Sequence, residues 1–199
     1  MGTKTPDIVV GSEVELLNAI STAPDNAEYV IGLNRDIVLT DSLEIPVSKN
    51  ITLMGVGKGV WRLVGANNQN TINVNGSLTI DGICVTHADG DVGRGVYVER
   101  NATFTMLGGV ISGNILEGST RDYAGGGVFV SYATFVMLGG EITGNTATSG
   151  GGMYSIDGYV DRPGGKIWGN TATHATSSYN DVAEASITKR PPEDSPPSE

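Results

Sequence analysis

The spacing of apolar residues changes from a helical period to a period of two after Pro24. Before that point, Ser12 stands three positions ahead of Glu15, an arrangement that caps the first turn of a helix. The apolar residues that follow recur at helical spacing: Val14, Leu17 and Ile20, with Leu16 beside them. We therefore expect one amphipathic helix over residues 12–22, with these apolar side chains on its buried side.

After the helix, the short strand-like runs form a repeat. Residues 104–109 read Phe-Thr-Met-Leu-Gly-Gly, and 31 residues later 135–140 read Phe-Val-Met-Leu-Gly-Gly. A second block, Gly-Gly-Gly-Val-Phe-Val at 125–130, has counterparts that begin at Gly93 and at Gly150. Each repeat of about 25 to 32 residues therefore holds three short strands separated by turns.

This repeat predicts an all-β fold, a right-handed parallel β-helix of roughly five to six coils with three short strands per coil. One coil cannot bury its apolar side chains alone, whereas coils stacked about 4.8 Å apart bury one continuous core. The repeat is too short for a propeller blade of four strands, and it has no leucine-rich signature. The expected helix over 12–22 would cover the open N-terminal end of the stack.

The alignment of the repeats assigns residues to columns that run along the stack. We expect one inward column to hold Cys84, Ile111, Ile142 and Ile167. We expect one turn position to hold His87, Asn114, Asn145 and Asn170. Asparagine tolerates a left-handed backbone, and its amide can bond to the asparagine above and below. The second column therefore predicts a structural ladder.

Charge and composition narrow the classes of partner. The 199 residues carry a net charge of −10, which disfavours binding to nucleic acid or to anionic lipid. No stretch is as long and apolar as a transmembrane helix, so we expect no direct membrane insertion. The single cysteine, Cys84, allows no disulfide within one chain, which for a secreted protein is normal at a Gram-positive bacterial surface.

The domain organisation follows from the extent of the repeats. Residues 8–188 are interpreted as a single β-helix domain, and residues 1–7 as a leader that precedes it. Residues 189–199 contain four prolines among acidic residues and serines, which predicts a disordered linker. We expect further domains of the same native chain beyond this linker.

The chain resembles the pectin-lyase-like β-helix superfamily in its capping helix, Ser12 to Ile20, and in its stacked coils. Three of its blocks also look like repeats of large Gram-positive bacterial surface proteins, among them adhesins: Gly-Gly-Gly-Val-Phe-Val at 125–130, Phe-Val-Met-Leu-Gly-Gly at 135–140 and Ile-Thr-Gly-Asn-Thr-Ala at 142–147. The resemblance covers roughly residues 8–188. It implies a secreted protein of the bacterial cell surface or cell wall.

Three aromatic residues fall in one outward column, one per coil: Tyr97, Phe129 and Tyr154. Rings stacked along a β-helix stabilise one another. Exposed flat rings also form a platform for sugar rings or for a partner protein. We expect the column to be exposed, and both roles are open at this stage.

The second candidate region is a pair of long insertions, 87–94 and 117–123, which occupy the same turn of consecutive coils. As neighbours in space they would bring charged side chains together: Asp89, Asp91, Arg94, Glu117, Arg121 and Asp122. Carboxylates at this density can bind calcium or act as an acid–base pair on a glycoside, although the same residues are also ordinary in solvated loops. The sequence has no zinc, nucleotide-phosphate or Ser-His-Asp motif, and we expect no cofactor.

These features favour a non-catalytic extracellular module that binds a glycan or a protein of a host or neighbouring cell, or that spaces other domains from the cell wall. The alternative is a carbohydrate-active enzyme of the pectin-lyase-like class, acting at 87–94 and 117–123. Against it, the Asn-Thr-Asp, Asp-Asp and Gly-His-Gly signatures of polygalacturonases are absent. A further alternative, an ice-binding β-helix, is disfavoured because its threonine column is interrupted: Thr52, Thr79 and Thr105 are followed by Val136.

Overall fold

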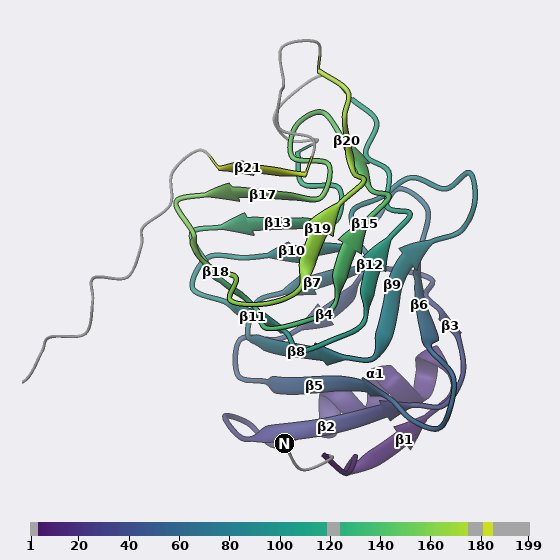
Figure 1. Cartoon of the computed structure of the whole chain (residues 1–199). Coiled ribbons are helices and arrows are strands. Elements are labelled where there is room, and N and C mark those ends of the chain that lie inside the picture. The colour runs from purple at the N-terminus through teal and green to yellow at the C-terminus, as the bar shows by residue number, and fades with distance from the viewer. Residues whose placement is uncertain (1–3, 119–123, 175–180, 185–199) are drawn as a thin grey trace, which may run out of the picture.

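The chain winds into a stack of coils (Figure 1). The computed structural model describes residues 4–118, 124–174 and 181–184. About six turns of backbone follow one another along an axis, and three parallel sheets run along the stack. The predicted all-β parallel β-helix with an N-terminal helix is confirmed.

The sheets of the described residues are called A, B and C, in the order in which each coil visits them. Sheet A contains, in spatial order, β1 (Ile8–Val10), β2 (Glu28–Leu33), β5 (Asn50–Gly55), β8 (Ser77–Asp81), β11 (Thr103–Met106), β14 (Thr134–Met137) and β18 (Tyr159–Asp161). Sheet B contains β3 (Ile37–Val38), β6 (Trp61–Gly65), β9 (Ile83–His87), β12 (Val110–Ser112), β15 (Glu141–Thr143) and β19 (Lys166–Trp168). Sheet C contains β4 (Leu43–Ile45), β7 (Ile72–Val74), β10 (Val96–Val98), β13 (Val128–Ser131), β17 (Met153–Ile156) and β21 (Val182–Glu184). A further pair joins β16 (Thr146–Ala147) to β20 (Thr171–Ala172).

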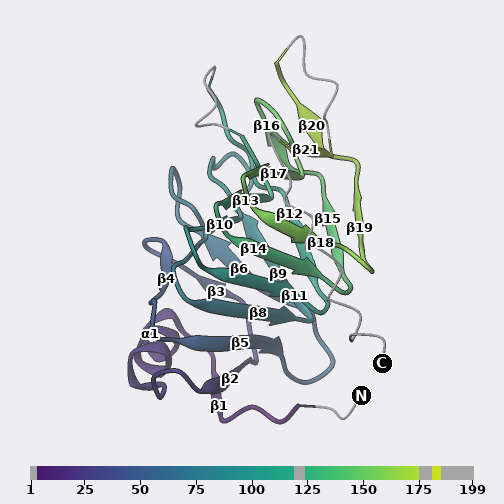
Figure 2. The same cartoon turned by 90° about the vertical axis from the view of Figure 1, so that its left-hand side faces the viewer.

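Parallel pairing sets equivalent residues of successive coils side by side, as the layered strands of sheet A show in Figure 2. Phe104 pairs with Phe135, and their rings stack at 5.3 Å between centroids in the core. Ile111 pairs with Ile142, which pairs with Ile167, as the repeat predicted. Ile111 and Ile142 are fully buried, so the column is part of one continuous core.

Cys84 does not lie in that inward column, which corrects the sequence alignment. Cys84 pairs with Val110, whereas Val85 pairs with Ile111 and is fully buried in the inward place. The offset between paired residues is 26 on both sides of this corner, from Met106 and Ile80 to Ile111 and Val85, whereas Asn114 meets His87 at an offset of 27. The offset at the asparagine ladder does not apply to the strand, and using it there displaces the predicted column by one residue. Partial burial raises the pKa of the Cys84 thiol, which therefore stays protonated at neutral pH.

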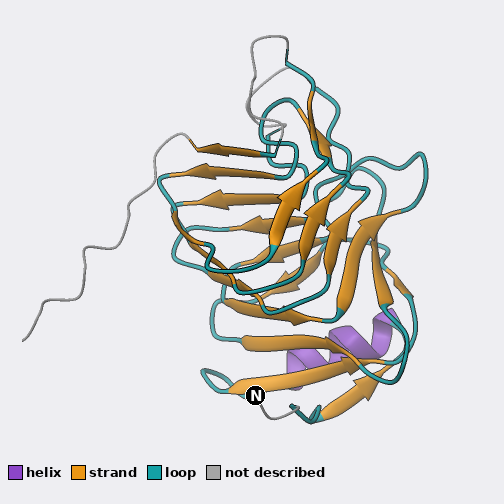
Figure 3. Cartoon of the chain, viewed as in Figure 1, coloured by secondary structure: helices purple, strands orange, loops and turns teal. Residues whose placement is uncertain are grey.

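Helix α1 (Glu13–Thr22) covers the N-terminal end of the stack (Figure 3). Ser12 Oγ accepts a hydrogen bond from the Glu15 amide at 3.3 Å, which confirms the predicted cap. The buried side of the helix matches the prediction in part: Leu16 and Ile20 are buried as predicted, together with Ala19 and the following Ala23. Val14 and Leu17 are instead 76% and 47% exposed. Helical spacing fits both the predicted and the observed set of buried residues. The observed set has the weaker apolar signal in the sequence, because it includes the small Ala19.

The predicted asparagine column is a buried ladder. Asn114 Nδ2 donates to Asn145 Oδ1 at 2.8 Å, and Asn145 Nδ2 donates to Asn170 Oδ1 at 3.0 Å. His87 contacts the first asparagine, as predicted, and Asp181 accepts from the last one at 3.0 Å. The ladder thus satisfies the polar groups that each coil buries at this corner.

Two of the sequence predictions concern residues outside the described part of the chain. They are the linker over 189–199 and the end of the domain at residue 188. No helix among the described residues has the length and apolar character needed to cross a membrane.

The first testable prediction concerns the cap. Leu16→Asp should lower the free energy of unfolding by more than about 3 kcal/mol, because it places an unpaired charge against the core. The matched control is Leu17→Asp, which changes a residue that is 47% exposed. It should change the free energy of unfolding by about 0.5 kcal/mol or less. Urea denaturation of both variants measures the difference, and equal losses would contradict the observed orientation of α1.

The second prediction concerns Ser155, which continues the inward column of Val98 and Val130 in sheet C. Its Oγ is buried and has no hydrogen-bond partner. An unsatisfied buried hydroxyl costs about 1–3 kcal/mol, so Ser155→Val should raise the free energy of unfolding by about 1–2 kcal/mol. Ser155→Ala removes the hydroxyl without filling the space and should give a smaller gain. Thermal denaturation checks both, and a lower melting temperature for both variants would refute the argument.

Candidate functional site at the corner between sheets B and C

The long loops of the chain gather at one corner of the stack, between sheets B and C. Loops 66–71, 88–95 and 113–127 connect β6 to β7, β9 to β10 and β12 to β13 in three successive coils. The prediction that the insertions beginning at residues 87 and 117 share one turn is confirmed for their described residues. Loop 66–71 is a third member of the same corner, which the sequence analysis missed.

Backbone hydrogen bonds hold these loops to one another. The Asn68 amide donates to the Val92 carbonyl at 2.7 Å, which joins the first loop to the second. The Gly93 amide donates to the Ile115 carbonyl at 2.7 Å, which joins the second loop to the third. The loops therefore continue the stacking of the coils beyond the ends of the strands.

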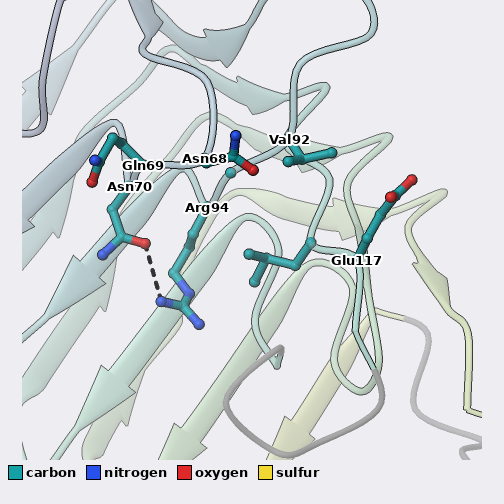
Figure 4. Close-up of a pocket in the computed structure, with 8 residues that line it drawn as sticks. Asn68, Gln69, Asn70, Val92, Arg94 and Glu117 are labelled. Carbon is teal, nitrogen blue, oxygen red and sulfur yellow. Dashed lines mark hydrogen bonds between the residues drawn. The ribbon is translucent and has the colours of Figure 1, made fainter.

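A groove of about 420 Å³ opens between the three loops, here called the loop-corner groove (Figure 4). In this view Gln69 and Asn70 lie on one side and Glu117 on the opposite side, with Asn68 and Val92 between them. Val92, Gly93, Arg94 and Leu116 complete the lining. The groove thus combines amide, guanidinium and carboxylate groups with a small apolar area.

Arg94 is the best-anchored charged residue of the groove. Only 7% of the surface of Arg94 is exposed. Nε and Nη2 donate to the carbonyls of Gly125 and Ala124 at 3.1 and 3.0 Å, and Nη1 donates to Asn70 Oδ1 at 3.1 Å. The planar guanidinium therefore ties the first loop to the third and orients the amide of Asn70.

The predicted aromatic column is present, but it is not exposed as expected. Tyr97 and Phe129 stack at 5.2 Å between ring centroids, and Phe129 and Tyr154 stack at 5.6 Å. Phe129 and Tyr154 are each only 7% exposed, and they form a second apolar cluster with Ala124. Arg94 lies over the rings of Tyr97 and Phe129 at 5.2 and 4.9 Å. The expectation of an exposed platform is therefore wrong for Phe129 and Tyr154, which are buried with Ala124 of the third loop, while Tyr97 is half-buried beside Arg94.

The carboxylates of the two insertions do not gather in the groove as predicted. Glu117 lines it, whereas Asp89 and Asp91 are not part of its lining; Asp89 is exposed and Asp91 is half-buried. Arg121 and Asp122 lie outside the described residues. Within the described part of the chain, no group of three or more His, Cys, Asp or Glu side chains is placed to hold a metal ion.

The sequence did contain a signal for the missed wall of the groove. Residues 67–70 read Asn-Asn-Gln-Asn and stand directly before Thr71 and the strand β7. Both insertions that the sequence analysis singled out also stand directly before a strand of sheet C. The equivalent position in the earlier coil would have placed this amide-rich run at the same corner.

Comparisons with known proteins add no family to this picture. No protein-family model matches the chain, and no curated protein or solved structure matches it.

The third prediction separates a buried aromatic column from an exposed one. Phe129→Ala should lower the free energy of unfolding by about 3–5 kcal/mol, because it removes a buried ring stacked on both sides. The control is Tyr132→Asn, which removes a ring that is 43% exposed and contacts Arg100. The control should cost less than about 1 kcal/mol. Chemical denaturation of the two variants measures both losses of stability. A smaller loss for Phe129→Ala than for Tyr132→Asn would contradict the burial of the column.

Proposed function

We propose that this chain is a non-catalytic binding module of an extracellular surface protein, and that it binds a glycan in the loop-corner groove. The observation that carries this proposal is the composition of the groove, a space of about 420 Å³ whose lining residues include three with amide side chains and one with a carboxylate. An amide both donates and accepts hydrogen bonds, as a sugar hydroxyl does. The amides of Asn68 and Gln69 can therefore match hydroxyls of one ligand, whereas the amide of Asn70 is bonded to Arg94 and to Asn73 and shapes the groove.

Rigidity supports the proposal. Arg94 fixes Asn70, and backbone bonds hold Asn68 to the second loop, so two of the three amide-bearing residues are tied to the stack before any ligand arrives. A preformed site loses less conformational entropy on binding. The groove also lies where three coils meet, so a chain of sugar units could follow it along the stack.

Charge favours a neutral glycan over an acidic one. The net charge is −10, and Glu117 adds a carboxylate at the groove itself. A uronate or sulfated sugar would meet this carboxylate, whereas neutral hydroxyls can donate to it. Arg94 is already bonded to the loop carbonyls and to Asn70, so its role is to shape the groove.

The number of carboxylates that line the groove favours binding of a glycan over its hydrolysis. A glycosidase needs two carboxylates about 5 to 10 Å apart across the scissile bond. Among the described lining residues, Glu117 is the one carboxylate. Two alternatives remain for the experiment to separate from binding: a carbohydrate-active enzyme, and a spacer that has no ligand.

The fourth prediction tests this function with a glycan array followed by titration calorimetry on the best neutral oligosaccharide. Glu117→Ala should weaken its binding about tenfold, the effect of one hydrogen bond to a charged group. Asp89→Ala removes an exposed carboxylate of the same corner that does not line the groove, and it should leave affinity unchanged.

Three results would overturn the proposal. Equal losses in the Glu117 and Asp89 variants would move the binding site away from the groove. Release of reducing or unsaturated sugars from a polysaccharide panel by the purified chain, abolished in Glu117→Ala, would replace binding with catalysis. A chain that folds but binds no glycan would support the spacer.

A further inference from the structure

His87 lies beneath the loop-corner groove, and both of its ring nitrogens face oxygen atoms. Nδ1 lies 2.8 Å from Asn114 Oδ1, and Nε2 lies 3.1 Å from the backbone carbonyl oxygen of Gln69. The residue is 2% exposed. The ring therefore bridges the first rung of the asparagine ladder and the wall of the groove.

Both partners are hydrogen-bond acceptors. The Gln69 partner is a backbone carbonyl, which cannot donate. The amide of Asn114 is oriented by the ladder, because its Nδ2 donates to Asn145 Oδ1 at 2.8 Å and to the Ser112 carbonyl at 3.2 Å. The same orientation recurs in the next coil, where Asn145 Nδ2 donates to Asn170 Oδ1. Asn114 Oδ1 is thus left to face the histidine.

A neutral imidazole has one N–H and can donate to only one of these two acceptors. An imidazolium has two N–H groups and satisfies both. We infer that His87 is a positioning residue that holds both Asn114 and the groove wall at Gln69 only when both ring nitrogens carry protons, and that on deprotonation it keeps the shorter bond, to Asn114 at 2.8 Å, and releases the wall at Gln69. Acid pH therefore orders the groove, and alkaline pH loosens it.

The backbone of two glycines lies close against the ring. A Cβ atom added at Gly93 would lie 2.2 Å from Nε2, and one added at Gly65 would lie 2.6 Å from it. Two glycines thus enclose the edge of the ring that faces Gln69. Thr71 Oγ1 is a further polar neighbour, 3.5 Å from Nδ1. The chain approaches this nitrogen as closely as glycine permits, which favours a direct bond to Gln69 over a bridging water.

The charged groups of the surrounding segments are few. Arg94 follows Gly93, and its guanidinium is bonded to the Gly125 and Ala124 carbonyls and to Asn70. Asp89 and Asp91 stand in the loop that follows His87, and Glu117 stands beyond Asn114. Asp181 accepts from Asn170 at the far end of the ladder.

The inference can be tested with a variant that the chain itself suggests. Asn occupies the equivalent position in the next three coils, so His87→Asn should keep the ladder while losing the reach to Gln69. The probe is hydrogen exchange of the Asn68, Gln69 and Thr71 amides, corrected for intrinsic rates, at pH 5.5 and pH 8. The Tyr132 amide, bonded to the Ile156 carbonyl at another corner, serves as internal control.

Protection of the three loop amides should rise about tenfold from pH 8 to pH 5.5 in the native chain, the effect of one charge-assisted hydrogen bond. It should not change with pH in His87→Asn, and the Tyr132 amide should not change in either protein. An equal pH response in both proteins would overturn the inference. So would a ¹⁵N spectrum of His174→Gln, in which His87 is the only histidine, that showed an unprotonated Nε2 at pH 5.5.

A binding measurement extends the test and rests on the proposed function. The neutral oligosaccharide that binds the groove should bind more tightly at pH 5.5 than at pH 8 in the native chain, and equally at both in His87→Asn. Absence of any glycan binding would refute the proposed function alone, because hydrogen exchange reports on the loop without a ligand. A pH-independent affinity together with pH-dependent protection would refute the link between His87 and the groove.

Discussion

Hydrogen bonds between coils run along the axis of the stack, and every other feature of this protein depends on them. Because the strands pair in parallel and in register, each residue must suit the equivalent residue above and below it. Phenylalanine therefore stacks on phenylalanine in the core, and asparagine bonds to asparagine at the corner. A residue that breaks its column, such as Ser155 among valines, leaves a polar atom without a partner. Uniform columns are thus a condition of stability rather than a by-product of repetition.

This constraint explains how much of the fold could be predicted. Two blocks with the same spacing, such as those around Phe104 and Phe135, place their residues in the same column without further information. The error at Cys84 arose where spacing alone does not suffice, because the offset between coils changes by one residue between the strand, where Ile111 pairs with Val85, and the ladder, where Asn114 meets His87. The face of α1 was misassigned in part, for a related reason. Apolar spacing along a helix admits two neighbouring stripes, and only the contact with the first coil selects between them.

The candidate site was less predictable, because burial at a corner depends on loops from other coils. The stacking of Tyr97, Phe129 and Tyr154 followed from their column, but their cover comes from Ala124 and Arg94. No local pattern indicates where those residues lie in space. The role of His87 was partly visible, since it stands in the asparagine column. Its second contact, to the Gln69 carbonyl, joins two coils and depends on the course of loop 66–71.

The loops differ in length mainly at one corner, and this separates two kinds of change in the molecule. The connections from sheet C to the next strand of sheet A are short throughout, as at 75–76, 132–133 and 157–158. A residue inserted there would have to shift a strand, whereas one inserted into loop 88–95 projects beyond the strands and disturbs no register. The corner between sheets B and C can therefore diversify while the frame stays constant. Natural variation, or a library of randomised loops, could therefore change the surface of this corner while the strand pairing stays the same.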